Sequence, residues 1–181
     1  MAWAGSYQSS LRAVFGESDL LPSLVVDKYN EYLVVQALSY GIDRHLDTIT
    51  GILVELFRPR GIYERDDVST RLLEGLEQRS RPLYGDVPET LLIEQNGFKF
   101  AVNLRSGQKT GYFLDQRENH SAIAPYVRHG RVLDCFCHIG SFAIHAAGYG
   151  AKEVLGLDIS EAAIETAREN ARINGVEKAC S

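Results

Sequence analysis

The stretch that decides the fold is Val132-Leu133-Asp134-Cys135-Phe136-Cys137-His138-Ile139-Gly140, followed by Val154-Leu155-Gly156-Leu157-Asp158. Each part starts as a short apolar run, which is typical of a buried strand, and each run ends in an aspartate. Helical patterns follow at residues 141–148 and 161–174, and Gly175 stands where a helix-terminating glycine belongs. Alternation of strand and helix in this order predicts parallel βαβ units in a doubly wound sheet.

The aspartate at the end of each predicted strand indicates a ligand site. In a doubly wound sheet, ligands bind outside the carboxyl ends of the strands, where Asp134 and Asp158 would both lie. A carboxylate after the second strand can accept hydrogen bonds from the two ribose hydroxyls of an adenosine, each worth about 1.5–3 kcal/mol. The alternative is that Asp158 only starts a helix, for which Ser160 is the predicted N-cap.

The turn after the first strand favours one adenosine cofactor over another. Dinucleotide sites use G-x-G-x-x-G, so that the backbone can approach a pyrophosphate. Here only Gly140 is present, and Phe136 and His138 would obstruct a phosphate. S-adenosylmethionine has no phosphate and needs one tight turn at its amino-acid end. The sequence therefore favours S-adenosylmethionine, with a binding site for NAD as the less favoured alternative.

The chain before residue 107 has a different pattern. Residues 24–29 and 32–37 predict a hairpin, residues 42–57 a helix and residues 60–64 a strand. Asn96-Gly97 separates two further apolar runs and predicts a second hairpin, because both turn residues must reach positive φ. We expect a small α+β domain over residues 24–106, preceded by a linker or remnant at 1–23.

The remaining residues, 107–181, are expected to form the first half of a Rossmann-like domain. A helix is predicted from about residue 116 to residue 127, with Asp115 and Glu118 as a capping box. Only two strands of the sheet are visible, so we expect a first βαβα half of the domain.

Composition limits the other classes of function. The net charge is −5, so the composition gives no support to nucleic-acid binding, which usually needs a basic surface. Cys135, Cys137 and Cys180 form neither a disulfide framework nor a zinc pattern, which favours a reducing, cytoplasmic setting and no metal. Cys135 is expected to pack as a small apolar residue under the sheet. No apolar run is long enough to span a bilayer.

Four motifs together resemble a known family. Residues 132–142 resemble the first cofactor motif of the class I S-adenosylmethionine-dependent ribosomal RNA large-subunit methyltransferases, in the group that includes a cytosine-5 enzyme with a PUA domain. Gly107-Gln108-Lys109-Thr110-Gly111-Tyr112-Phe113-Leu114-Asp115-Gln116-Arg117 is similar to a hallmark of that group, and residues 24–29 fit the hairpin of its middle domain. Asn170-Ala171-Arg172-Ile173-Asn174-Gly175 fits the group's second cofactor helix. The resemblance covers about residues 10–178.

The resemblance implies a set of cofactor contacts and a substrate. The segment 109–117 would fold over the cofactor near its methionine end, and the alternative is an interdomain linker. The expected cofactor-binding residues are Lys109, Phe113, Asp115, Arg117, Asp134, Phe136, Gly140, Asp158 and Ile159. The implied substrate is a base of large-subunit ribosomal RNA, with cytosine C5 favoured. We also allow for a homodimer.

This sequence also departs from the family's pattern. His138-Ile139 replaces a more usual aromatic–threonine pair, and no PUA domain is recognisable. The Asp-Pro-Pro motif and the nucleophilic cysteine of the cytosine-5 enzymes are not found before Ser181, so we assign no catalytic residue and expect a fragment truncated at both ends. The alternative function is a non-catalytic module that binds RNA or protein.

Overall fold

The computed structural model describes residues 10–107 and 109–181 and divides into two compact units. The described part of the first unit comprises residues 10–91 and 102–114, and the second comprises residues 92–101 and 115–181. This division follows packing, so it groups residues 107–114 with the α+β unit and the hairpin tip 92–101 with the βαβ unit.

The first unit is built on a five-stranded mixed sheet in the order β1-β2-β3-β4-β5. Its strands are β1 (Ser10–Phe15), β2 (Leu24–Tyr29), β3 (Tyr32–Ala37), β4 (Gly61–Asp66) and β5 (Arg79–Gly85). The pair β3–β4 is parallel and the other pairs are antiparallel. The chain crosses from β3 to β4 through α1 (Tyr40–Arg44) and α2 (Leu46–Phe57), as a parallel connection requires.

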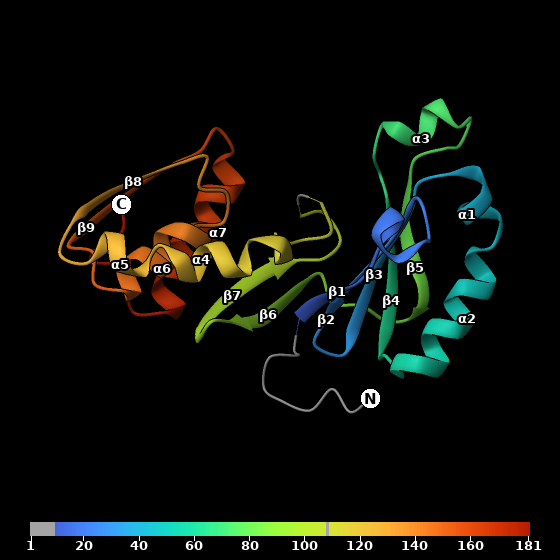
Figure 1. Cartoon of the computed structure of the whole chain (residues 1–181), viewed down its shortest axis with the longest axis horizontal. Coiled ribbons are helices and arrows are strands. Elements are labelled where there is room, and N and C mark those ends of the chain that lie inside the picture. Colours follow the sequence, from blue (N-terminus) through green and yellow to red (C-terminus); the bar gives the residue numbers. More distant parts are fainter. Residues whose placement is uncertain (1–9, 108) are drawn as a thin grey trace. The chain divides into compact units, whose positions relative to one another are not determined.

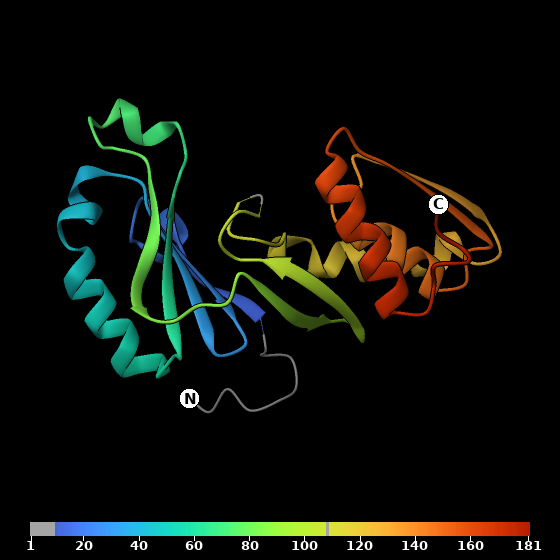
Figure 2. The same ribbon diagram turned by 180° about the vertical axis from the view of Figure 1, so that it is seen from behind.

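One face of this sheet carries the main core of the unit. Helices α1 and α2 run along one side of the sheet in Figures 1 and 2. Leu46 and Leu53 of α2 belong to the same buried cluster as Leu33, Val35 and Ile62 of the sheet. The apolar spacing of residues 42–57 therefore gives the helical face that was expected, although His45 interrupts the helix.

Two strands of this sheet were not predicted from the sequence. Residues 10–15 were assigned to a linker but form β1, in which Arg12 lies opposite Asp27 of β2 and pairs with it at 2.8 Å. Strand β5 contains Pro82 and two arginines and lies at the sheet's edge, where a proline costs no ladder hydrogen bond. Apolar periodicity did not predict either strand, because β1 and β5 contain charged residues and β5 also contains a proline. Residues 1–9 of the expected linker lie outside the described residues.

Carboxylates and arginines form a buried network beside β4. Arg71, from the short helix α3 (Thr70–Leu73), donates to Asp66 at 2.7 Å and to Asp43 at 2.9 Å, and Arg79 donates to Glu64 at 2.6 Å. Burial raises the pKa of Asp66 to about 8, and Glu64 adds to the rise. The three carboxylates lie close enough to hold a cation. Because guanidinium groups already occupy oxygens of all three carboxyl groups, the network serves structure.

The second predicted hairpin is present. Strands β6 (Thr90–Gln95) and β7 (Phe98–Asn103) form a two-stranded sheet. Asn96 has φ 53° and Gly97 has φ 83°, as the two-residue turn requires.

The second unit contains the predicted βαβα order. Strands β8 (Arg131–Cys135) and β9 (Glu153–Leu157) are parallel, with Val132 opposite Val154, and α6 (Ser141–Gly148) connects them. Helix α7 (Glu161–Ile173) follows, with Ser160 as its N-cap and Gly175 at φ 67° after its end. This is the Rossmann-like α/β arrangement that was expected.

The expected helix over residues 116–127 is divided. A 3₁₀ turn (Leu114–Gln116) leads into α4 (Arg117–Ala122), and α5 (Ala124–Val127) follows. Pro125 accounts for the break, because it supplies no backbone N–H to continue the helix. The predicted capping box was wrong: Gln116 takes the N-cap position, and its side chain makes no capping hydrogen bond.

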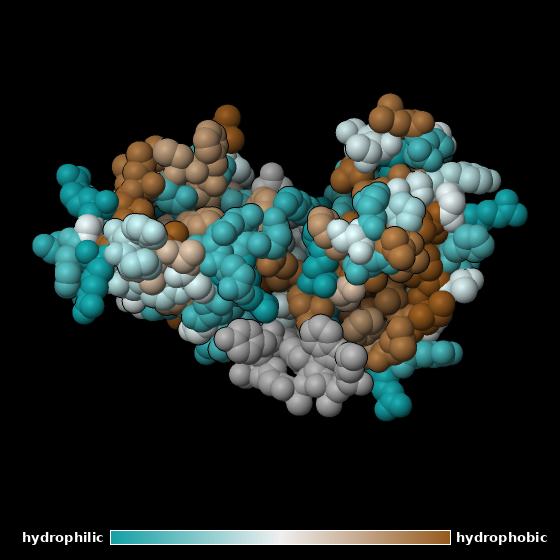
Figure 3. Space-filling model, viewed as in Figure 1, coloured by the Kyte–Doolittle hydropathy of each residue, from teal (hydrophilic) through white to brown (hydrophobic). Residues whose placement is uncertain are grey.

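Apolar side chains also remain on the surface of the second unit. Leu133, Leu155 and Leu157 of β8 and β9 are 58%, 43% and 49% exposed. Figure 3 shows hydrophobic surface over these strands. Among the described residues, no helix is both long and apolar enough to cross a membrane.

Candidate cofactor-binding site

Five of the expected cofactor residues come together in the second unit. Asp134 lies near the end of β8, Phe136 and Gly140 lie in the turn after it, and Asp158 and Ile159 directly follow β9. The two strands are parallel and in register, with Cys135 opposite Leu157. Their carboxyl ends, and the residues that follow them, therefore lie at the same edge of the sheet.

Asp158 is fixed by backbone donors from both sides. Its Oδ1 accepts from the N–H of Ser160 at 2.9 Å, and its Oδ2 accepts from the N–H of His138 at 2.9 Å. These bonds lower the pKa of Asp158, so the carboxylate is charged at neutral pH. A carboxylate has about four acceptor positions, and the two named bonds leave others for the hydroxyls of a ribose.

The turn between β8 and α6 has an unusual backbone. Phe136, His138 and Gly140 have φ values of 62°, 50° and 81°, in the left-handed region. The turn is held by hydrogen bonds from Cys137 N to Leu157 O at 3.0 Å and from Gly140 N to Cys137 O at 2.8 Å. Such conformations are costly for residues other than glycine and gather at functional sites. Phe136 is 87% exposed and Ile159 is fully exposed, so the ring of Phe136 and the aliphatic side chain of Ile159 are both available to a ligand.

Asp134 binds the beginning of α6. Its Oδ2 accepts from the N–H of Ala143 at 3.0 Å. Burial raises the pKa of Asp134 to about 6, and the charge of Asp158 adds to the rise. This bond ties the end of β8 to the first turn of α6, and contact of Asp134 with a cofactor stays a prediction.

The cysteines differ from the expectation. Cys135 is exposed, so the prediction that it packs under the sheet was wrong, and Cys137 is the buried one. Cys135 alternates along β8 onto the same exposed face as Leu133, and apolar patterning alone does not show which face of the strand is covered. Burial raises the pKa of Cys137 to about 11, so its thiol is protonated and a poor nucleophile at neutral pH.

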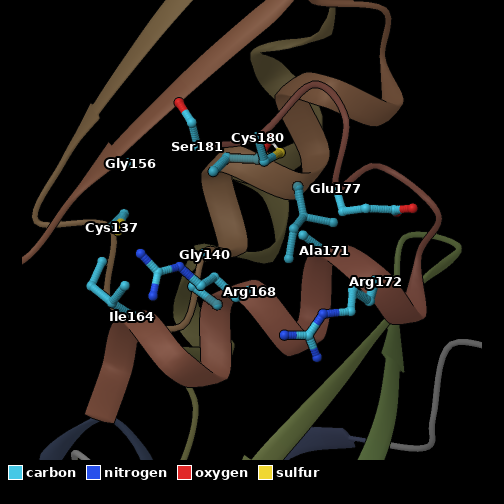
Figure 4. A pocket seen from close by; sticks show the side chains of 13 residues that line it. Cys137, Gly140, Gly156, Ile164, Arg168, Ala171, Arg172, Glu177, Cys180 and Ser181 are labelled. Carbon is cyan, nitrogen blue, oxygen red and sulfur yellow. Dashed lines mark hydrogen bonds between the residues drawn. The ribbon is translucent and has the colours of Figure 1, made fainter. Parts of the chain in front are cut away.

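A pocket of about 400 Å³ opens beside this turn. Figure 4 shows Ile164, Arg168 and Ala171 of α7 on one side of it, with Cys180 and Ser181 on another. Among the expected cofactor residues, only Gly140 lines it. The pocket therefore lies next to the candidate site, and Asp134 and Asp158 do not line it.

The motif at residues 107–117 is divided between the two units. Residues 109–114 belong to the first unit, whereas Asp115 and Arg117 belong to the second. Lys109 has φ 53°, and its ammonium nitrogen lies 4.3 Å from the centre of the Phe113 ring. Asp115 is exposed, and the carbonyl of Arg117 accepts from Asn96 at 2.9 Å.

A buried polar cluster, which the sequence did not reveal, anchors this motif in the first unit. The hydroxyl of Thr110 donates to Asp27 at 2.5 Å and lies 3.0 Å from the hydroxyl of Tyr29. The Tyr29 hydroxyl also accepts from the N–H of Tyr112 at 3.2 Å. Asp27, Tyr29, Thr110 and Tyr112 are all fully buried. The one sequence signal for this cluster is an aspartate in the middle of an apolar strand.

The fold defines the class: an α/β protein with two aspartates at the carboxyl ends of the parallel strands of a βαβ unit. The family described as S-adenosylmethionine-dependent methyltransferase matches residues 76–180, more than half of the chain. The chain belongs to this family, whose cofactor is S-adenosylmethionine.

Curated relatives match nearly the whole chain. The ribosomal RNA large subunit methyltransferase I of Tolumonas auensis is 45% identical over 168 residues, which are 92% of this chain and 42% of that protein. The protein of the same name from Aeromonas hydrophila is 46% identical over the same shares. This chain thus spans less than half the length of these relatives.

Solved structures share the fold. A SAM-dependent methyltransferase from Streptococcus mutans has a TM-score of 0.84 at 22% identity, covering 98% of this chain and 46% of that one. A methyltransferase complexed with SAH has a TM-score of 0.82 at 23% identity, covering 95% and 44%. These likenesses show a Rossmann-like methyltransferase fold.

Proposed function

We propose that this chain is the cofactor-binding part of a methyltransferase that modifies a base of large-subunit ribosomal RNA. The observation that carries the proposal is the Asp158 carboxylate, held by two backbone N–H groups and charged at the carboxyl end of β9. The bound cofactor would supply an electrophilic methyl group. Asp158 would hold the ribose, and the turn ending at Gly140 would accommodate the amino-acid end.

The residues of the site fit S-adenosylmethionine better than a dinucleotide. Exposed side chains at Phe136 and Ile159 offer apolar contact at a site without a glycine-rich phosphate loop. The chemistry of the turn thus favours the same cofactor as the family match over residues 76–180.

The substrate is proposed from the curated relatives, which are named for large-subunit ribosomal RNA. Cytosine C5 as the target atom is the finer proposal and rests on the family resemblance alone. A reducing, cytoplasmic location is proposed from the three cysteines, which are all free thiols. Contacts of Lys109, Phe113, Asp115 and Arg117 with the cofactor, and a homodimer, stay predictions.

The test of function is methyl transfer by the protein extended to the length of its relatives. Labelled S-adenosylmethionine and undermodified 23S ribosomal RNA are expected to yield labelled RNA, and mass spectrometry of nucleosides identifies the base. Asp158→Ala should strongly reduce labelling at cofactor concentrations that only just suffice for the unsubstituted protein. Equal labelling by both proteins would refute the assignment of Asp158, and no labelling of any ribosomal RNA would refute the proposed substrate.

A further inference from the structure

Asn170 has a polar side chain at a buried position of a helix, where apolar side chains are usual. It lies on α7 in the second unit and is fully buried, beside the buried Ala171 and one turn from Ala167. A buried amide is costly unless both of its ends are hydrogen-bonded. Here both ends are bonded, and the two partners belong to different segments.

The first partner is the turn of the candidate cofactor site. Asn170 Nδ2 donates to the carbonyl oxygen of Ile139 at 3.1 Å. Ile139 immediately precedes Gly140, the N-cap residue of α6. This bond therefore fixes the peptide at which the cofactor turn becomes a helix.

The second partner is strand β7 of the hairpin. Asn170 Oδ1 accepts from the N–H of Ala101 at 2.7 Å. One turn further along α7, Asn174 Oδ1 accepts from the N–H of Lys99 at 2.9 Å, and its Nδ2 donates to the Lys99 carbonyl at 2.6 Å. Residues 99 and 101 present their N–H groups on the same strand edge, so two asparagines spaced by four residues can bind both.

Helix α7 also contacts the cofactor turn directly. A Cβ atom added to Gly140 would lie 3.1 Å from the Cβ of Ala167, which is tighter than ordinary packing. Ala167 and Asn170 are three residues apart and thus lie on the same side of the helix. The turn is therefore held at two consecutive residues, by a hydrogen bond at Ile139 and by close packing at Gly140.

We propose that Asn170 is a positioning residue for cofactor binding, because it holds the Ile139–Gly140 peptide of the cofactor turn against α7 and joins that turn to the β6–β7 hairpin. This proposal rests on the proposed function of the turn. Asn174 binds only the hairpin strand and its own helix among its named partners. Substitution of Asn174 therefore affects attachment of the hairpin, whereas substitution of Asn170 also affects the position of the turn.

The experiment compares Asn170→Ala with Asn174→Ala in the full chain, after thermal melts have shown that both are folded at the working temperature. Calorimetric titration with S-adenosylhomocysteine is expected to show binding about tenfold weaker for Asn170→Ala, because part of the binding free energy must then restore the turn that the lost hydrogen bond held in place. Asn174→Ala should change affinity by less than about twofold. A third variant, Asn170→Asp, keeps an acceptor for Ala101 but loses the donor to Ile139, and it should resemble Asn170→Ala.

Hydrogen exchange supplies a readout that needs no cofactor. The amides of His138 and Gly140, bonded to Asp158 and to the Cys137 carbonyl, should exchange faster in Asn170→Ala than in Asn174→Ala. Equal affinities and equal exchange for the two alanine variants would overturn the proposal. If the unsubstituted chain does not bind S-adenosylhomocysteine, the proposed cofactor site fails, and the exchange rates alone decide whether Asn170 positions the turn.

Discussion

At the scale of single residues, the site depends on polar groups whose partners are backbone atoms. Asp134 and Asp158 could be predicted from the sequence, because each ends an apolar run. Their partners could not, because the N–H groups of His138 and Ala143 reach them only through a left-handed turn and a helix start. Residues 170–175 resemble the family's second cofactor helix, but the partners of Asn170 could not be predicted, since a polar residue in a helix does not show whether it is buried.

The cluster of Asp27, Tyr29 and Thr110 leads to a prediction about stability. Tyr29→Phe removes a buried hydroxyl that lies within hydrogen-bonding distance of Thr110 and Tyr112, so it should lower the free energy of unfolding by about 1–3 kcal/mol. Urea denaturation measures this loss. Tyr126→Phe is the matched control, because Tyr126 is 87% exposed, and it should change stability by less than about 0.5 kcal/mol. Equal effects of the two substitutions would show that the buried hydroxyl contributes nothing.

A buried histidine predicts how stability depends on pH. His120 is buried, binds Gln95 at 2.7 Å and stacks on His145; burial and His145 lower its pKa from 6.5 to about 3. Between pH 6.5 and about pH 3, His120 is protonated in the unfolded chain but not in the folded chain. His120 therefore lowers the free energy of unfolding as pH falls below about 6.5.

The melting temperature of His120→Phe should therefore fall less steeply between pH 7 and pH 4 than that of the unsubstituted chain. His129→Asn is the control, since His129 is exposed and its φ of 62° suits asparagine, and it should leave the slope unchanged. Parallel pH curves for the chain and His120→Phe would contradict the assignment.

At the scale of elements, periodicity and turn chemistry identified most of the helices and strands. The Asn96–Gly97 hairpin and the β8-α6-β9-α7 order follow from signals contained in each segment. Strands β1 and β5 and the break between α4 and α5 depend on pairing partners or on proline, so apolar periodicity could not reveal them.

Gly140 tests the close packing of α7 on the cofactor turn. Gly140→Ala adds a methyl group at φ 81° and 3.1 Å from Ala167, whereas Gly175→Ala adds one at φ 67° with open space around it. Both should incur about 1 kcal/mol for the left-handed backbone, and Gly140→Ala should lose at least 1 kcal/mol more. Chemical denaturation of the two variants gives the difference. Equal losses would mean that α7 does not constrain the turn.

At the scale of the whole molecule, the sequence predicted the family and the order of the structural segments. It did not predict how they are grouped, because the tip of the β6–β7 hairpin packs with the βαβ unit through side chains such as Asn170 and Phe98. The family match and the relatives named for ribosomal RNA support the resemblance to large-subunit methyltransferases.

The measurement that tests the central claim most directly is a calorimetric titration of the chain and of Asp158→Ala with S-adenosylmethionine, with NAD as the competing ligand. The chain should bind S-adenosylmethionine and not NAD. Asp158→Ala should weaken binding by at least about tenfold, because the carboxylate's hydrogen bonds to the ribose contribute about 1.5–3 kcal/mol each. Unchanged affinity in Asp158→Ala, or preferential binding of NAD, would contradict the account.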